Sequence, residues 1–361
     1  MNLASPHNPG APSSRSLIAK GRGPRRAVLA RWGGAWGIVC GSKRPLALLA
    51  ALLCTLSALA QKPDPYLFAY FKEPGNQGIY LAISRDGLHY TPLNDGQTWL
   101  AASDPRPNPK QGEDMRDIFL TRAPDNTFRA VWTRNWTGNS LGTASSPDLI
   151  HWSEQKQIPI MQDFPDVNNV WAPETYWDAA SGKWLLIWSS SMKGSPDGNR
   201  IWSSLTPDFK IFSKPTIFFD PGYVVIDATI FHAASGPWRL IFKEQSNDPL
   251  TYNERVATSG KLTGPYDLKT ISGFINESWS EGPSAIEVGD RVVVFYDHYR
   301  ATRARFEAVA TRDWKHWDDI TSEISLPAYC KHGSFLRITE AEAQGLEARH
   351  DAPANQTPTT Q

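Results

Sequence analysis

Asp227-Ala228-Thr229-Ile230-Phe231 is one of four short strand-like segments that each begin with an acidic residue. The other three begin at Asp117, Glu174 and Glu281. The four acids are separated by 57, 53 and 54 residues, and a His-Gly pair at His332 follows 51 residues after the last acid. This regular spacing predicts one repeated structural position at the start of a strand. If the strands converge on one axis, the carboxyl groups converge as well.

A second element recurs between the acids. It combines a small or polar residue, a turn acid and a closing aromatic residue. Four clear copies and one weaker copy occupy residues 84–90, 146–152, 206–212, 311–317 and 260–266. Apolar runs lie between the two elements. A unit of roughly 50–60 residues with about four short strands, many Trp residues and Gly, Pro or Asp turns is the sequence pattern of a propeller blade.

Five copies predict an all-β fold, a five-bladed β-propeller. The first copy lacks an inner strand before Tyr66, whereas a spare one, residues 333–338, follows the fifth copy. The C-terminal strand is therefore expected to complete blade one, which leaves no open edge between the first and last blades. A β-sandwich also has short strands and turns, but it does not explain the regular period with an acid in phase.

Residues 1–60 are predicted to be an N-terminal extension and a secretory signal. Lys43-Arg44 precede the apolar run Leu46–Leu56, and Ala58-Leu59-Ala60 form a cleavage site before Gln61. The run is shorter than the roughly 20 residues that a membrane span needs. We therefore expect a secreted or periplasmic protein. Twin-arginine export through Arg25-Arg26 is the less favoured alternative, because no apolar run follows that pair closely.

Residues 61–340 are predicted to form the propeller catalytic domain. Residues 341–361 turn to Glu, Ala and Gln and then to Pro, Thr and Gln, which predicts a disordered tail. Once the signal is removed, Cys330 is the remaining cysteine, so no intramolecular disulfide is expected. One Cys beside His332 does not make a zinc site.

The composition points to a neutral partner. The chain has 37 basic and 37 acidic residues, so no net field attracts nucleic acid or an anionic membrane, and neither is expected as a partner. Its 15 Trp and 11 Tyr residues would suit stacking on sugar rings, although most of them are expected to pack between blades. The expected partners are oligosaccharides or the side chains of polysaccharides.

A ring of carboxyl groups suits glycosidic bond cleavage. That reaction needs one carboxylic acid to protonate the leaving oxygen and one carboxylate to activate water or attack carbon. A third carboxylate nearby would raise the pKa of the proton donor and keep it protonated near neutral pH. The four acids of the repeat supply these roles.

The same residues resemble glycoside hydrolase family 43. The resemblance runs from about Tyr66 to Ile338 and rests on several motifs in order: Met115-Arg116-Asp117, Trp171-Ala172-Pro173-Glu174, Ile226-Asp227-Ala228-Thr229, Glu281-Gly282-Pro283-Ser284 and His332-Gly333-Ser334. It implies a five-bladed propeller and an inverting hydrolase, exo-acting on α-L-arabinofuranosides, β-D-xylosides or related furanosides such as β-D-galactofuranosides.

The resemblance also implies roles for individual residues. Asp117 matches the general base, Asp227 the acid that tunes pKa and orients, and Glu281 the general acid. His332 matches a histidine near the channel centre, which in some relatives helps hold a metal ion, often calcium, through water. No cofactor is otherwise required. One departure concerns Ile118, which stands where relatives of this branch commonly have Pro after the base.

Further residues are expected to contact substrate. Trp171 and Glu174 are assigned to this role, with a structural turn as the equal alternative; Trp136 and His298 are assigned to the pocket wall, with plain packing as the alternative. His332 completes the set. Two other functions stay open. A retaining fructan-type hydrolase is suggested by Arg116-Asp117 but lacks that group's nucleophile motif, and a non-catalytic carbohydrate-binding propeller is permitted by Ile118.

Overall fold

The computed structural model describes residues 64–74, 78–103, 115–300 and 305–350. All of them lie in one unit of the chain, Leu59–Gln361. The predicted signal and its cleavage site fall outside the described residues. Among those described, no helix is both long and apolar enough to cross a membrane.

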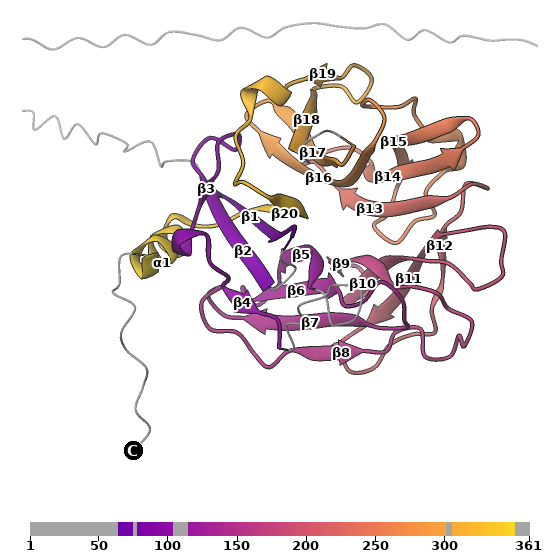
Figure 1. Cartoon of the computed structure of the whole chain (residues 1–361), viewed down its shortest axis with the longest axis horizontal. Coiled ribbons are helices and arrows are strands. Elements are labelled where there is room, and N and C mark those ends of the chain that lie inside the picture. The colour runs from indigo at the N-terminus through magenta and orange to yellow at the C-terminus, as the bar shows by residue number, and fades with distance from the viewer. Residues whose placement is uncertain (1–63, 75–77, 104–114, 301–304, 351–361) are drawn as a thin grey trace, which may run out of the picture. The chain divides into compact units, whose positions relative to one another are not determined.

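Five antiparallel sheets form the five blades of a β-propeller, as predicted (Figure 1). Blade 2 contains β5 (Arg116–Arg122), β6 (Phe128–Thr133), β7 (Leu141–Ser146) and β8 (Lys156–Ile158). Blade 3 contains β9 (Trp171–Asp178), β10 (Lys183–Ser190), β11 (Arg200–Thr206) and β12 (Thr216–Phe219). Blade 4 contains β13 (Val225–Phe231), β14 (Trp238–Asn247) and β15 (Leu250–Ser259). Blade 5 contains β16 (Ser280–Val288), β17 (Arg291–His298), β18 (Arg305–Thr311) and β19 (Asp318–Asp319).

Blade 1 joins the two ends of the propeller, as the sequence predicted. It contains β1 (Tyr66–Lys72), β2 (Gly78–Ser84), β3 (Thr91–Pro92) and β4 (Leu100–Ala101), with β20 (Cys330–Arg337) as its innermost strand. β20 pairs with β1 from Tyr66 opposite Arg337 to Lys72 opposite Cys330. The last strand therefore closes the ring. Short 3₁₀ turns occupy Asn94–Gly96, Leu268–Thr270 and Thr321–Glu323.

The chain does not become a tail at residue 341, so that predicted boundary is wrong. Residues Glu340–His350 form helix α1, which begins with a reciprocal cap. The Glu342 amide donates to the Thr339 hydroxyl at 3.2 Å, and the Thr339 amide donates to the Glu342 carboxylate at 2.8 Å. Ala343 and Leu346 are fully buried. The helix therefore belongs to the folded domain, and residues 351–361 lie outside the description.

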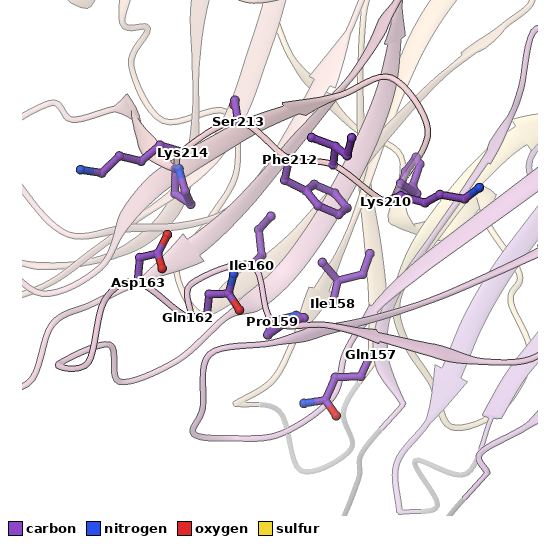
Figure 2. Close-up of a pocket in the computed structure, with 13 residues that line it drawn as sticks. Gln157, Ile158, Pro159, Ile160, Gln162, Asp163, Lys210, Phe212, Ser213 and Lys214 are labelled. Atoms are coloured by element: carbon purple, nitrogen blue, oxygen red, sulfur yellow. The ribbon is translucent and has the colours of Figure 1, made fainter.

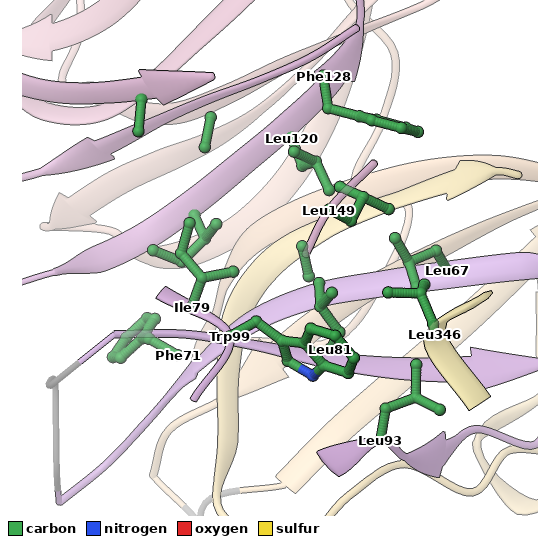
Figure 3. Close-up of a cluster of buried hydrophobic side chains, with 14 of the residues drawn as sticks. Leu67, Phe71, Ile79, Leu81, Leu93, Trp99, Leu120, Phe128, Leu149 and Leu346 are labelled. Atoms are coloured by element: carbon green, nitrogen blue, oxygen red, sulfur yellow. The ribbon is translucent and has the colours of Figure 1, made fainter. Parts of the chain in front are cut away.

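The core is divided into clusters between the blades. The cluster in Figure 3 joins blades 1 and 2 and includes Leu346 of α1 beside Leu67 and Leu93. Across the closing pair, the rings of Phe68 and Phe335 stack 4.2 Å apart. The buried Trp residues, Trp99, Trp132, Trp184 and Trp188, all pack in these clusters.

Candidate active site

Each inner strand carries a β-bulge near its start. Two residues of the inner strand lie opposite one residue of the second strand, at positions 117–118 in β5, 172–173 in β9, 227–228 in β13, 282–283 in β16 and 332–333 in β20. A bulge turns a strand and re-aims its side chains. In this fold it directs residues from all five blades toward one end of the channel.

The bulge defines the true repeated position. Asp117, Ala172, Asp227 and Gly282 lie at intervals of 55 residues and all have left-handed φ, of 50°, 45°, 51° and 63°. Glu281 is one residue before this position and Glu174 is two residues after it. The prediction that the four acids share one position is therefore correct for Asp117 and Asp227 and wrong for the two glutamates.

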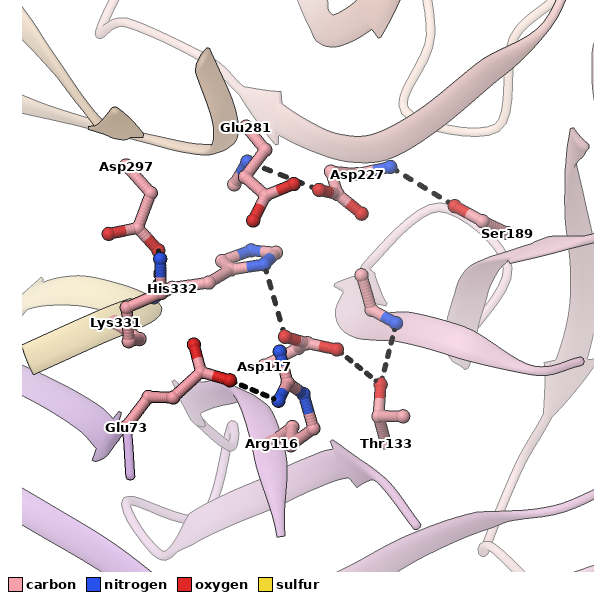
Figure 4. A network of polar contacts seen from close by, with 12 residues as sticks. Glu73, Arg116, Asp117, Thr133, Ser189, Asp227, Glu281, Asp297, Lys331 and His332 are labelled. Carbon is pink, nitrogen blue, oxygen red and sulfur yellow. Dashed lines mark hydrogen bonds and ion pairs between the residues drawn. The ribbon is translucent and has the colours of Figure 1, made fainter. Parts of the chain in front are cut away.

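The bulges surround a small pocket of about 100 Å³ (Figure 4). Its lining residues are Arg116, Asp117, Thr133, Trp136, Trp171, Ile226, Asp227, Glu281 and His332. The structure thus brings together all three predicted catalytic acids with Trp136, Trp171 and His332. It does not bring Glu174 or His298 to this lining.

Asp117 is held as a carboxylate. Thr133 donates its hydroxyl to Oδ2 at 2.6 Å, and Nδ1 of His332 lies 3.5 Å from Oδ1. Burial alone would raise the pKa of Asp117, but the hydrogen bond and positive charge of His332, together with Arg116 and Thr133, lower it to about 2. Asp117 is therefore ionised at neutral pH and available to accept a proton from water.

His332 is the cation that faces Asp117. Burial alone would lower its pKa, but the nearby carboxylates, Asp117 first among them, raise it to about 9. Its ring also packs on Gly282, where a Cβ atom would come within 2.5 Å of the His332 Cγ. Only glycine fits at that position.

The described residues near His332 include no side-chain group that would bind calcium directly. Calcium takes six to eight oxygen ligands. In the described part of the chain, no group of three or more His, Cys, Asp or Glu side chains is placed to hold a metal ion. The Asp117 oxygens already face Thr133 and His332. We therefore derive no step through a metal.

Asp227 shares the lining with the other two acids and interacts electrostatically with both. Its Oδ2 accepts the Gly282 amide at 3.2 Å, and its own amide donates to the Ser189 hydroxyl at 3.1 Å. Burial raises the pKa of Asp227 to about 6; the charge of His332 opposes the rise and that of Glu281 adds to it. Asp227 thus links the bulges of blades 4 and 5.

Glu281 is the most accessible of the three acids, with 28% of its side chain exposed. Its Oε2 accepts from the ammonium of Lys243 at 3.1 Å. Lys243 itself is only 2% exposed. The carboxyl group is therefore anchored on one oxygen at the pocket wall.

Sequence reasoning missed a set of supporting residues on the second strands. They lie opposite the residue before each bulge and each contacts the inner strand of the next blade, and we call them the support positions: Phe71, Thr133, Ser189, Lys243 and Asp297. Thr133 accepts the Ala172 amide at 2.8 Å, and Asp297 accepts the His332 amide at 2.7 Å. Four of the five follow an aromatic residue that ends an apolar run, which is the signal that could have found them.

Arg116 and two Trp residues form the wall on the side of blades 2 and 3. The Arg116 guanidinium lies 4.5 Å from the centre of the Trp136 ring and 3.2 Å from a Glu73 oxygen. Trp171 meets Trp136 edge to face at 6.1 Å and donates its Nε1–H to the Trp136 carbonyl at 2.9 Å. Trp136 is 42% exposed. The wall therefore presents an aromatic surface held in a fixed orientation.

Glu174 is buried and lies outside the pocket lining. It accepts from the hydroxyl of Tyr176, which also receives the Ile230 amide at 2.7 Å. Burial raises the pKa of Glu174 to about 8. The residue therefore joins blades 3 and 4 rather than facing the pocket. His298, at the end of β17, is partly buried and its Nδ1 has no hydrogen-bond partner among the described residues.

A wider hollow lies between the outer parts of blades 2 and 3 (Figure 2). It has a volume of about 540 Å³ and lies between residues 157–163 and 209–215. Among its described lining residues, Asp163 is the one carboxyl group. A single acid does not provide the pair that glycosidic bond cleavage needs.

The whole propeller matches a known family. Residues 62–344 match the family model described as "Probable glycosyl hydrolase domain", a family related to glycoside hydrolase family 43. The chain belongs to this family. The resemblance carried by the bulge motifs is thereby confirmed.

Proteins similar in sequence include an α-L-arabinofuranosidase from Bifidobacterium longum subsp. longum. It is 23% identical to this chain over 81% of the chain and 33% of its own length. This chain thus spans about a third of that relative.

Solved structures with a similar chain course include an α-L-arabinofuranosidase from Lactobacillus brevis, at 16% identity, with 57% of this chain and 72% of that chain covered and a TM-score of 0.47. An endo-arabinase from Bacteroides thetaiotaomicron is 14% identical, with 59% of this chain and 81% of that chain covered and a TM-score of 0.47.

Proposed function

We propose that the pocket hydrolyses glycosidic bonds with inversion of the anomeric centre. One observation carries the proposal: Asp117, Asp227 and Glu281 line a single pocket in which Asp117 is ionised. Ordinary structural carboxylates in a propeller have no reason to gather at one end of the channel. Inversion requires a carboxylate that activates water and a second carboxyl group that protonates the leaving oxygen.

In this scheme Asp117 accepts a proton from a water molecule that attacks the anomeric carbon. Glu281 gives its proton to the glycosidic oxygen, and the bond between that oxygen and the anomeric carbon breaks with the electron pair remaining on oxygen. Asp227 lies beside Glu281 and its negative charge favours the protonated form of a neighbouring acid. His332 keeps Asp117 ionised and oriented.

The proposed substrates are α-L-arabinofuranosides, β-D-xylosides or related furanosides such as β-D-galactofuranosides, cleaved at a chain end. The small pocket supports an exo mode, because it has room for little more than a terminal residue. Trp136 and Trp171 would stack on the apolar face of a sugar. The arabinofuranosidase relative favours the first substrate class.

A screen of nitrophenyl glycosides with the mature protein tests this function, and NMR of the first-formed product identifies the anomer. Turnover with inverted product supports the proposal. A retained anomer would instead favour the fructan-type mechanism. Binding of oligosaccharides with no turnover of any glycoside would make the propeller a carbohydrate-binding module.

We also propose export of the chain to a secreted or periplasmic location, on the basis of the positive flank, apolar run and small-residue site before Gln61. N-terminal sequencing of exported protein should give Gln61 as the first residue. A mature N-terminus before Lys43 would refute the assignment.

A further inference from the structure

Lys243 departs from the pattern of the support positions. Thr133, Ser189 and Asp297 each supply an oxygen that accepts a bulge amide of the next blade, at 2.8, 3.1 and 2.7 Å. An ammonium group has no lone pair and cannot do this. In blade 5 the corresponding amide, that of Gly282, donates to Asp227 instead. Lys243 therefore does not accept a bulge amide, as the oxygen-bearing support residues do.

The ammonium of Lys243 is enclosed by aromatic rings. It lies 4.6 Å from the ring centre of Tyr299 and 5.4 Å from that of Tyr252. Both rings keep water away from a cation whose close carboxylate partner is Glu281, at 3.1 Å. A charge-assisted hydrogen bond in such surroundings is directional and fixes the orientation of both groups.

We propose that Lys243 is a positioning residue for Glu281, which holds Oε2 so that Oε1 carries the proton delivered to the glycosidic oxygen. The proposal rests on the hydrolase function proposed above. When the proton leaves Oε1 and the bond to the anomeric carbon breaks, Glu281 becomes a carboxylate that Lys243 already contacts. Lys243 thus breaks the repeated pattern of backbone support beside Glu281. Departures from a local structural pattern are expected at functional sites.

Several charged groups face this pair from the neighbouring strands. Those near Lys243 or Glu281 are Asp227 of β13, Glu254 of β15, Asp297 of β17, and Lys331 and His332 of β20. Burial alone would lower the pKa of Lys243, but Glu281 and Asp227 raise it to about 12. Lys243 thus stays charged throughout a practical pH range.

The test compares Lys243→Met and Lys243→Thr with wild type. The Met variant removes the charge, and the Thr variant supplies the residue that blade 2 uses at its support position. The control is Arg255→Met, because Arg255 forms a 2.6 Å ion pair with Glu244 in the same sheet and does not reach Glu281. Each variant is assayed on a nitrophenyl glycoside and on the matching alkyl glycoside, with a pH profile and a melting temperature.

Both Lys243 variants should lose roughly 10- to 100-fold in kcat/KM on the alkyl glycoside and about threefold or less on the nitrophenyl glycoside, which needs little protonation. The alkaline limb of the alkyl profile should move to higher pH, because both variants remove a positive charge that lies 3.1 Å from the Glu281 carboxyl group. Lys243→Arg should restore part of the alkyl activity. Arg255→Met should change neither the ratio of alkyl to nitrophenyl activity nor the alkaline limb of the pH profile.

Equal losses on both substrates, or an unmoved alkaline limb, would overturn the proposal and leave Lys243 a structural residue. That result is distinct from failure of the hydrolase function, in which wild type turns over neither glycoside. In that case the positioning role of Lys243 is refuted together with the hydrolase function.

Discussion

Blades 3 and 4 have the same backbone at the channel end and different side chains on it. The bulge residue is Ala172 in blade 3 and Asp227 in blade 4, with φ of 45° and 51°. In both, a hydroxyl from the preceding blade accepts the bulge amide: Thr133 for Ala172 and Ser189 for Asp227. The bulge is therefore independent of the side chain it carries.

This comparison separates geometry from chemistry. Left-handed φ is unfavourable for alanine, yet blade 3 keeps the bulge at Ala172. This residue supplies no acid to the pocket. The acid of blade 3, Glu174, lies two residues further along the strand and bonds Tyr176. A shift of two residues thus moves a carboxyl group from the pocket lining to a contact between blades 3 and 4.

The largest expected effect comes from removing the acid at the bulge of blade 2. Asp117→Asn should lower kcat by about 10²- to 10⁴-fold on nitrophenyl and alkyl glycosides alike, because water must be activated in either case. Steady-state kinetics on both substrates measure the loss. Near-normal turnover on the nitrophenyl substrate would show that another acid holds the water.

Glu281→Gln should separate the two kinds of substrate. We expect a loss of about 10²-fold or more on alkyl glycosides and of roughly tenfold on nitrophenyl glycosides, since an activated leaving group needs little protonation. Glu287→Gln, an exposed position on the same strand, is the matched control. A uniform loss on both substrates would count against Glu281 as the acid.

Gly282→Ala tests whether the bulge tolerates a side chain in blade 5 as it does in blade 3. The added Cβ would meet the His332 ring at 2.5 Å and would stand at a φ of 63°, so we expect a loss of about 1–3 kcal/mol in unfolding free energy. Denaturant titration measures it. Ala172→Gly is the reciprocal change and should gain up to about 1 kcal/mol.

Glu174→Gln should change the pH dependence of stability rather than activity. The pKa of Glu174 is raised from 4.5 to about 8 in the folded protein, so only the folded chain keeps the proton between these values. Its contribution is fully present below about pH 4.5 and is lost as pH rises toward 8. The amide cannot ionise, so the variant should melt a few degrees higher than wild type at pH 8.

Melting temperatures measured from pH 5 to 8 check this, again with Glu287→Gln as control. A slope against pH equal to that of wild type would show that Glu174 is ionised in the folded protein. A large loss of activity in Glu174→Gln would restore the residue to the substrate-contact role that the sequence assigned to it.

The fold could be predicted from the sequence because the repeated residues lie at the strand starts and turns that define each blade. Asp117 and Asp227 stand at the bulge itself, so their spacing pointed directly at the pocket. Glu174 was misplaced because spacing alone does not reveal which residue of a strand adopts left-handed φ. Lys243 was missed because its partner lies 38 residues away, in the next blade. Helix α1 was not predicted because an Ala- and Glu-rich composition also fits a tail, and the helix is fixed by the cap between Thr339 and Glu342 and by the burial of Leu346.

The closing pair of β20 with β1 has a consequence for how the protein is made. Synthesis proceeds from the N-terminus, and His332 lies on the last strand to leave the ribosome. Until that strand is added, β1 keeps an unpaired edge and Asp117 lacks the cation that faces it. A nascent or prematurely terminated chain that lacks β20 therefore holds the proposed catalytic acids of blades 2, 4 and 5 without His332 beside them, and we expect hydrolytic competence only once β20 has paired with β1.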